Sequence, residues 1–466
     1  MKDLSRLIHA VTDEESESVI RYYSLNNNGS SKRLKLFNMV RWKDINDDRL
    51  AAKKLYNSRP CAAFSQLKKR LKEDILNILL SRETATGKSP KNFVDAEAQA
   101  LKYVLYGKML LNRGLTDEAV DVLKKAFKLA RDHEAFEVEA LAHSVFKTYS
   151  ISQYSEELAD AEQNFAEHVD DFYQLMRLNL QSPHCHTIIE SKEIPDKRKD
   201  SNASIRLSFL LAQQQLEGFL RTGQYYKAQE VAESTLHNVR KNGHLLSSSQ
   251  KARFYLSLSK VKLGLEQFDE VIYYGRQSSE LFKPFEENKL EALTHIFKGY
   301  FHCREQEKAK ATLKTCNAMA QSLKDTPNEI PLFQAYLLFR EMNFRGSLKS
   351  LNQFFRLSKS PIEVVLNGRM LELQNLVETE DYDWFDYKLD SFRKLVKYHA
   401  CEQLSERFTL IYKVFTELKR CNYQKVCLKE HSKNGFLNKL SDKNSDFYWN
   451  SLGSELVPVH RWLMGA

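Results

Sequence analysis

The amino-acid sequence predicts an all-α protein, and three observations support this fold class. Glycine and proline are scarce, at 15 and 9 of 466 residues, which is about 5% where roughly 12% is usual. Sheets joined by tight turns need these residues at every corner, whereas helical hairpins need few. Apolar residues recur at spacings of three and four, and one pattern of small residues occurs more than once. The hydrophobic content of 42% is ample for a core.

The first part of the chain, residues 1–92, predicts a basic helical N-terminal domain followed by a linker. Turn-forming residues at 26–31 separate two short helices, and residues 83–92 are typical of a linker or long loop. A longer amphipathic helix is expected after Pro60. Its apolar face must be buried, and it consists of Phe64, Leu67, Leu71, Ile75, Ile78 and Leu79.

Residues 93–433 carry the repeated pattern. Small residues stand at Gly107, Ala119 and Ala126, separated by twelve and by seven, and the spacing from Gly114 to Ala119 recurs from Gly223 to Ala228. This pattern resembles the tetratricopeptide (TPR) motif, in which small residues let two antiparallel helices approach closely where they cross. The resemblance implies an α-solenoid of antiparallel helix pairs. Weaker copies, with bulky residues where the motif has small ones, include Gly275, Gly299, Phe344 and Tyr382.

The last segment, residues 434–466, predicts a C-terminal cap. It carries Phe447, Trp449 and Trp462. A solenoid needs such a segment, because the last repeat otherwise exposes its apolar face.

Composition indicates a cytoplasmic protein that does not insert into a membrane. The N-terminus leads into acidic residues with no continuous apolar stretch of the secretory kind. The longest apolar runs, such as 335–339, are far shorter than the roughly 20 residues that span a bilayer. Seven cysteines, an odd number, favour reduced thiols over a disulfide framework.

The sequence predicts a protein that is not an enzyme and has no cofactor and no metal. Neither a glycine-rich phosphate loop nor a His-Glu-x-x-His segment occurs. The His184-Cys185-His186 cluster is expected in a loop, where adjacent residues rarely ligate one ion. Cys421, Cys427 and His431 are better explained as small core thiols and a surface histidine. A cysteine and a histidine that meet only in the fold stay possible, but no cysteine has a recognisable catalytic context.

A ligand-binding surface is expected in the groove lined by the first helix of each pair. Counting from the small residues predicts a cationic set on that face, which Glu217 interrupts: Lys108, Arg221, Arg253, Lys260 and Lys298. Such a groove would favour acidic peptides or phosphate-bearing partners. The alternative is that these side chains form only the solvated side of amphipathic helices.

Three functions are compatible with this reading. The first is a scaffold or adaptor that binds a protein or peptide in the groove. The second is a signalling or transcriptional regulator with an effector head and ligand-sensing repeats. This layout resembles, in architecture alone, the peptide-responsive aspartate-phosphatase regulators of bacteria. The third is nucleic-acid binding through the head, because residues 1–95 hold 19 Lys or Arg against 12 Asp or Glu. Partner, process and oligomeric state stay open.

Overall fold

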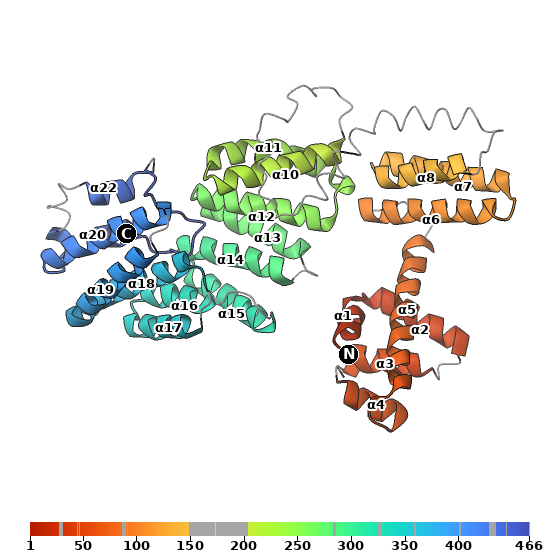
Figure 1. Ribbon diagram of the computed structural model, residues 1–466, viewed down its shortest axis with the longest axis horizontal. Helices are drawn as coiled ribbons and strands as arrows, with labels where there is room; N and C mark the ends of the chain where they lie inside the picture. The colour runs from red at the N-terminus through yellow and green to blue at the C-terminus, as the bar shows by residue number, and fades with distance from the viewer. Residues whose placement is uncertain are drawn as a thin grey trace. The chain divides into compact units, whose positions relative to one another are not determined.

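The computed structural model describes residues 1–27, 31–43, 45, 47–85, 90, 92–148, 173, 204–282, 286–323, 329–357, 360–399, 402–427, 435–443 and 445–465. Its secondary structure in these residues is helical throughout, which confirms the all-α prediction (Figure 1). None of the described helices is both long and apolar enough to cross a membrane. The chain divides into two compact units, and each is described by itself. Unit 1 comprises residues 1–210 and 241–247, and unit 2 comprises residues 211–240 and 248–466.

Unit 1 begins with a small helical domain that has its own core. Its helices are α1 (Lys2–Ala10), α2 (Asp13–Asn27), α3 (Lys32–Lys43), α4 (Asp48–Tyr56) and α5 (Ala62–Ala85). The side chain of Asp47 accepts a hydrogen bond from the Arg49 backbone N–H and so caps α4. The core contains the predicted face of α5 together with residues of the other helices: Leu4, Ile8, Val19, Tyr23, Leu36, Phe37, Val40, Phe64, Leu71 and Ile75.

A helical hairpin follows in unit 1, formed by α6 (Phe93–Leu111) and α7 (Thr116–Asp132), with α8 (Phe136–Thr148) next to it. Ala119 and Ala126 are fully buried in α7. A Cβ atom added to Gly107 would lie 2.6 Å from Leu123 Cγ, which is closer than such atoms approach. The prediction that these small residues lie where the two helices cross is therefore confirmed.

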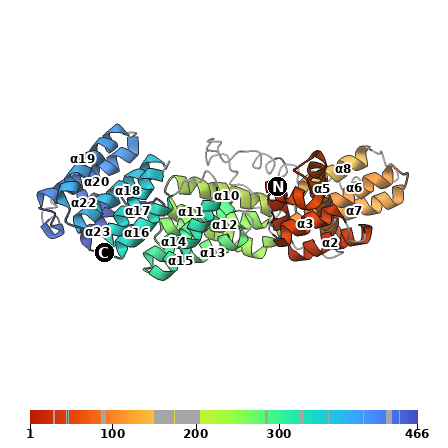
Figure 2. The ribbon, with the colours of Figure 1, turned by 90° about the horizontal axis from the view of Figure 1, so that it is seen from below.

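The paired helices continue in unit 2, where they follow one another in chain order in both views (Figures 1 and 2). The first helices of the pairs are α10 (Ile205–Arg221), α12 (Ser248–Gly264), α14 (Glu286–His302), α16 (Ile330–Arg340), α18 (Ile362–Glu378) and α20 (Glu402–Arg420). The second helices are α11 (Tyr225–Lys241), α13 (Phe268–Leu281), α15 (Gln306–Ser322), α17 (Phe344–Leu357) and α19 (Tyr382–Tyr398). Two short helices close the chain, α22 (Phe436–Ser441) and α23 (Val459–Met464).

One turn geometry recurs in these hairpins. The turn residue has positive φ, its N–H donates to the carbonyl three residues earlier, and the next N–H donates to the carbonyl five residues earlier. This is the Schellman arrangement. In unit 2 it recurs every 38 residues, at Glu266, Arg304, Met342 and Glu380. The first two glycines of the predicted pattern, Gly114 and Gly223, have the same role.

The second helix of each hairpin is anchored five residues after the turn residue. The anchor is fully buried or nearly so in every case: Ala119, Ala228, Val271, Ala309, Ser347 and Phe385. The fold is thus a helical-repeat solenoid with a 38-residue period over much of unit 2. The weaker copies predicted from the sequence belong to the same series, although their anchors differ in size.

Candidate binding face

The 38-residue period identifies equivalent residues on the first helices. The residue eleven positions before each buried anchor is called the inner position, and the side of the first helices that carries it is called the inner face. In unit 2 the successive inner positions from α12 to α18 are Lys260, Lys298, Tyr336 and Gln374. Lys108 is the inner position of α6, and Glu217 is that of α10.

The C-terminal segment of the chain lies along the inner face of unit 2, and three side chains there bind its backbone. Lys298 Nζ donates to the carbonyl oxygens of Leu452, at 2.7 Å, and Gly453, at 2.8 Å. Gln374 Nε2 donates to the Val457 carbonyl oxygen at 3.2 Å. The third inner position, Tyr336, forms a hydrogen bond with the Leu456 backbone. Consecutive repeats therefore bind consecutive residues of one non-helical stretch of the chain.

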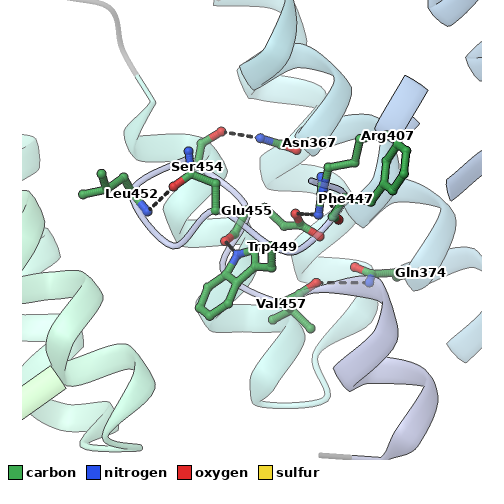
Figure 3. A network of polar contacts seen from close by, with 10 residues as sticks. Asn367, Gln374, Arg407, Phe447, Trp449, Leu452, Ser454, Glu455 and Val457 are labelled. Atoms are coloured by element: carbon green, nitrogen blue, oxygen red, sulfur yellow. Dashed lines mark hydrogen bonds and ion pairs between the residues drawn. The ribbon is translucent and has the colours of Figure 1, made fainter. Parts of the chain in front are cut away.

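Side-chain pairs fix the same segment, which we call the tail (residues 442–464). Asn367 Nδ2 on α18 donates to Ser454 Oγ at 2.9 Å. Arg407 on α20 pairs with the Glu455 carboxylate at 2.5 Å and donates to a tail carbonyl at 3.2 Å. The indole of Trp449 donates to the Glu455 carbonyl oxygen at 2.8 Å, which closes a loop within the tail. Figure 3 shows these groups converging from α18, α20 and the tail.

The tail also reaches α12, far from the end of the repeats. The Glu266 carboxylate accepts hydrogen bonds from Tyr448, at 2.6 Å, and from Arg461. Burial disfavours the charged carboxylate, but the two hydrogen bonds together with the positive charges of Arg461 and Lys443 outweigh it, so the pKa of Glu266 lies below its ordinary value. Ser451 Oγ donates to the Leu263 carbonyl oxygen at 2.6 Å. The tail thus spans the inner face from α12 to α20.

Apolar side chains anchor the tail in the core of unit 2. Leu456, Val459, Trp462 and Leu463 are buried in the same hydrophobic cluster as the side chains of α16 and α18. Consequently α18 has buried residues all around its circumference between Leu366 and Val377. The sequence had predicted a cap at the end of the repeats. Among the described residues α22 packs against α20, and the tail lies along the inner face, where Trp449 and Trp462 are buried and carbonyl oxygens of the tail accept hydrogen bonds.

The predicted cationic set is not brought together as a free surface. Lys298 is buried beneath the tail, and burial lowers its pKa to about 8. Its prediction as a groove residue open to a ligand is therefore corrected: the tail carbonyls already hold its ammonium group. Lys260 pairs with Glu291 at 2.7 Å, and Arg221 approaches Glu217 at 3.9 Å. Arg253 in unit 2 and Lys108 in unit 1 are exposed, and neither has an ion pair within the described chain.

No family model matches the chain, and no curated protein matches it. The solved structures that are similar to it include the crystal structure of the apo form of RapI, at 10% sequence identity and a TM-score of 0.40, with 78% of this chain and 96% of that chain covered.

The metal candidates of the sequence are only partly within the described structure. The cluster at 184–186 and His431 lie outside the described residues. Burial, followed by the hydrogen bond and charge of Cys427, raises the pKa of Cys421 to about 11, which favours the thiol over the thiolate that ligates metals. Among described residues no group of three potential ligands could hold an ion.

Proposed function

We propose that this chain is a non-enzymatic protein-interaction scaffold of TPR type, whose inner face binds an extended segment of a partner protein. The observation that supports the proposal is the tail itself. An irregular stretch of polypeptide lies on the first helices and is held by side chains of successive repeats. The inner face therefore has the chemistry of a peptide-binding surface.

The mode of binding explains how one face could accept different sequences. Lys298, Gln374 and Arg407 donate to backbone carbonyl oxygens, which every peptide offers. Specificity would come from side-chain contacts such as that of Arg407 with Glu455. Arg253 is exposed on α12 beyond the tail and can meet an acidic residue of a longer partner segment.

Two parts of the tail differ in how they are held. The described residues of 442–455 make mainly polar contacts, with Trp449 as their large buried apolar side chain. Residues 456–463 carry most of the apolar anchors. In this proposal the first part is exchanged for a partner segment while the second part stays docked, because exposing polar contacts to water costs less than exposing a hydrophobic cluster.

The proposal includes no catalytic role and a cytoplasmic location. Burial raises the pKa of Cys303 to about 11 and that of Cys316 to about 12, so neither thiol is a ready nucleophile at neutral pH. The described cysteines, Cys61, Cys303, Cys316, Cys421 and Cys427, are all free thiols. Free thiols are typical of reducing compartments.

The test is an exchange experiment on the full chain. A recognition sequence for a site-specific protease is inserted after the exposed Lys443, and the folded protein is cut there so that the first part of the tail has a free end. A fluorescent synthetic peptide of residues 444–455 is then added. We expect the labelled peptide to bind in place of the first part of the tail, while residues 456–463 stay docked and unit 2 stays folded. Lys298→Met and Arg407→Met should each weaken binding of the peptide about tenfold or more, because each removes a donor to a carbonyl oxygen of the first part.

The matched control is Lys349→Met on the second helix α17, where the lysine is exposed. It should leave peptide affinity unchanged. If the peptide binds only when unit 2 unfolds, the first part of the tail is a permanent part of the fold and the inner face is not a binding surface for partners.

A further inference from the structure

The N-terminal domain carries an unbalanced run of positive charge, which we call the basic segment (residues 49–72). It has eight basic residues and no acidic one: Arg49, Lys53, Lys54, Arg59, Lys68, Lys69, Arg70 and Lys72. Mixed charge is what keeps an ordinary helical surface soluble, so a run of one sign needs another explanation.

The structure places the basic segment on one helical hairpin, formed by α4, the connection 57–61 and the first half of α5. Lys68 Nζ lies 2.8 Å from an Asp48 carboxylate oxygen, and the rings of Tyr56 and Phe64 meet edge to face with centroids 6.4 Å apart. The start of α4 is thus fixed to the interior of α5, and the end of α4 to its beginning. The basic side chains are displayed on a fixed scaffold.

Three acidic residues of the same domain form ion pairs, one of them with the basic segment. Asp13 pairs with Arg41, Asp74 with Arg33, and Asp48 with Lys68. Only one residue of the basic segment, Lys68, therefore has a carboxylate partner among the described residues. The other seven basic residues are exposed and have none there.

Burial of the opposite helix faces directs these charges outward. Ala51 and Ala52 are fully buried in α4, which leaves Lys53 and Lys54 on its outer side. On α5 the buried Leu71 likewise leaves its neighbours Arg70 and Lys72 in solvent. The charges are fixed by the core of the domain rather than carried on a loose arm.

The composition of this surface decides which polyanion it fits. The centre of a protein interface is depleted in charged residues and enriched in aromatic ones. In the basic segment Leu50 is the one large apolar side chain exposed among described residues. A phosphate backbone, in contrast, is bound chiefly by Lys and Arg. We propose that the basic segment binds the phosphate backbone of a nucleic acid without reading its base sequence.

The proposal has a measurable signature in its salt dependence. Binding that neutralises about five phosphates of a duplex should lose affinity about 10²- to 10³-fold between 50 and 200 mM salt. The experiment uses the full chain and fluorescence anisotropy with three probes: a 20-base-pair DNA duplex of mixed sequence, an RNA duplex of the same length, and poly-glutamate. We expect binding of at least one duplex with this salt dependence and weaker binding of poly-glutamate.

Charge reversal locates the surface. Lys53→Glu combined with Lys54→Glu should weaken duplex binding at least tenfold and make its salt dependence shallower. The matched control, Lys125→Glu with Lys128→Glu on the exposed side of α7, changes net charge equally and should alter affinity less than twofold. If the first pair impairs folding, judged by the thermal melt, Lys53→Gln with Lys54→Gln is used and should weaken binding in the same direction.

Three outcomes would overturn the proposal. One is no duplex binding at 50 mM salt. Another is an equal loss in both charge-reversal pairs, which would show a net-charge effect without a site. The third is preference for poly-glutamate, which would assign the surface to an acidic protein.

Discussion

At the scale of single residues, the tail creates an unusual environment for histidine. His302 stacks on Phe268, with ring centroids 4.4 Å apart, and it also lies against Trp449 of the tail, at 5.2 Å. Burial, together with the positive charges of Arg340, Arg461 and Lys298, lowers its pKa to about 3. His460 within the tail is lowered to about 4, again mainly by burial. Both rings are therefore neutral in the folded protein at any ordinary pH.

The first prediction is that unit 2 loses stability in mild acid. The folded pKa of His302 lies below the unfolded value of about 6.5, so its contribution is fully present above pH 6.5 and is lost as the pH falls below it. At pH 5 the loss from this residue is about 2 kcal/mol. His302→Phe keeps the stacked ring without the titration, so the difference in urea-unfolding free energy between pH 7 and pH 5 should shrink by about this amount. His399→Phe, at an exposed site, should leave the difference as in the parent.

Two helical glycines give a second prediction at this scale, because they differ in the space around them. Gly107→Ala gains about 1 kcal/mol of helix propensity but forces a methyl group against Leu123, at a typical cost of about 1–3 kcal/mol. Gly218 in α10 has no atom within 4 Å of the added methyl group. Gly218→Ala should therefore stabilise the protein by about 0.5–1 kcal/mol, and Gly107→Ala should not. Equal gains in urea melts would show that α6 and α7 do not meet closely at Gly107.

At the scale of elements, the hairpin turns explain how far sequence reasoning could reach. Gly114 and Gly223 take the left-handed conformation at their turns, and glycine is the residue expected there. The next turns place Glu266, Arg304 and Met342 in the same conformation, with φ of 60°, 62° and 58°. These turn residues are not glycine, so the sequence carries no residue-type signal for these turns. The first repeats were therefore recognisable from sequence, whereas the strict 38-residue period required the backbone.

The third prediction concerns the steric strain of a residue other than glycine at positive φ. Met342 is 79% exposed, so its side chain makes little packing contact that a substitution would remove. Met342→Gly should stabilise the protein by about 0.5–1 kcal/mol, because glycine adopts positive φ without a steric penalty. Gly114→Ala, the reverse change at an equivalent turn, should destabilise by a similar amount. Chemical denaturation of both variants checks the pair, and a loss in Met342→Gly would show a contact not accounted for.

The candidate site divides in the same way into a predictable and an unpredictable part. Three residues of the predicted cationic set, Lys108, Lys260 and Lys298, occupy the inner position of their helices. In sequence the three lysines look alike. Only Lys298 is buried, because a segment some 150 residues later covers it, and its hydrogen bonds span 154 and 155 residues. Local periodicity contains no information about such a long-range contact.

At the scale of the whole molecule, the tail changes how the repeats depend on one another. In a solenoid each repeat contacts only its neighbours, so stability is a sum of local terms and distant repeats can open independently. The tail departs from this pattern within unit 2, because it contacts repeats that are not neighbours of one another. It contacts Glu266, after α12, and Gln374, on α18, although two complete helix pairs lie between them. We therefore expect α12 and α18 to unfold together.

The last prediction tests this coupling by native-state hydrogen exchange. In the parent, slow amides of α12 and α18 should exchange with one common free energy, since opening either helix first requires release of the tail. Glu266→Ala removes the acceptor for Tyr448 and Arg461. Hydrogen bonds to a charged group contribute about 1.5–3 kcal/mol, so α12 amides should exchange about tenfold or more faster while those of α18 change far less. Glu287→Ala, at an exposed site on α14, controls for loss of a carboxylate and should leave both helices as in the parent. If α12 and α18 already exchange with different free energies in the parent, each repeat opens alone. The tail would then lie on the inner face without making the unfolding of unit 2 cooperative.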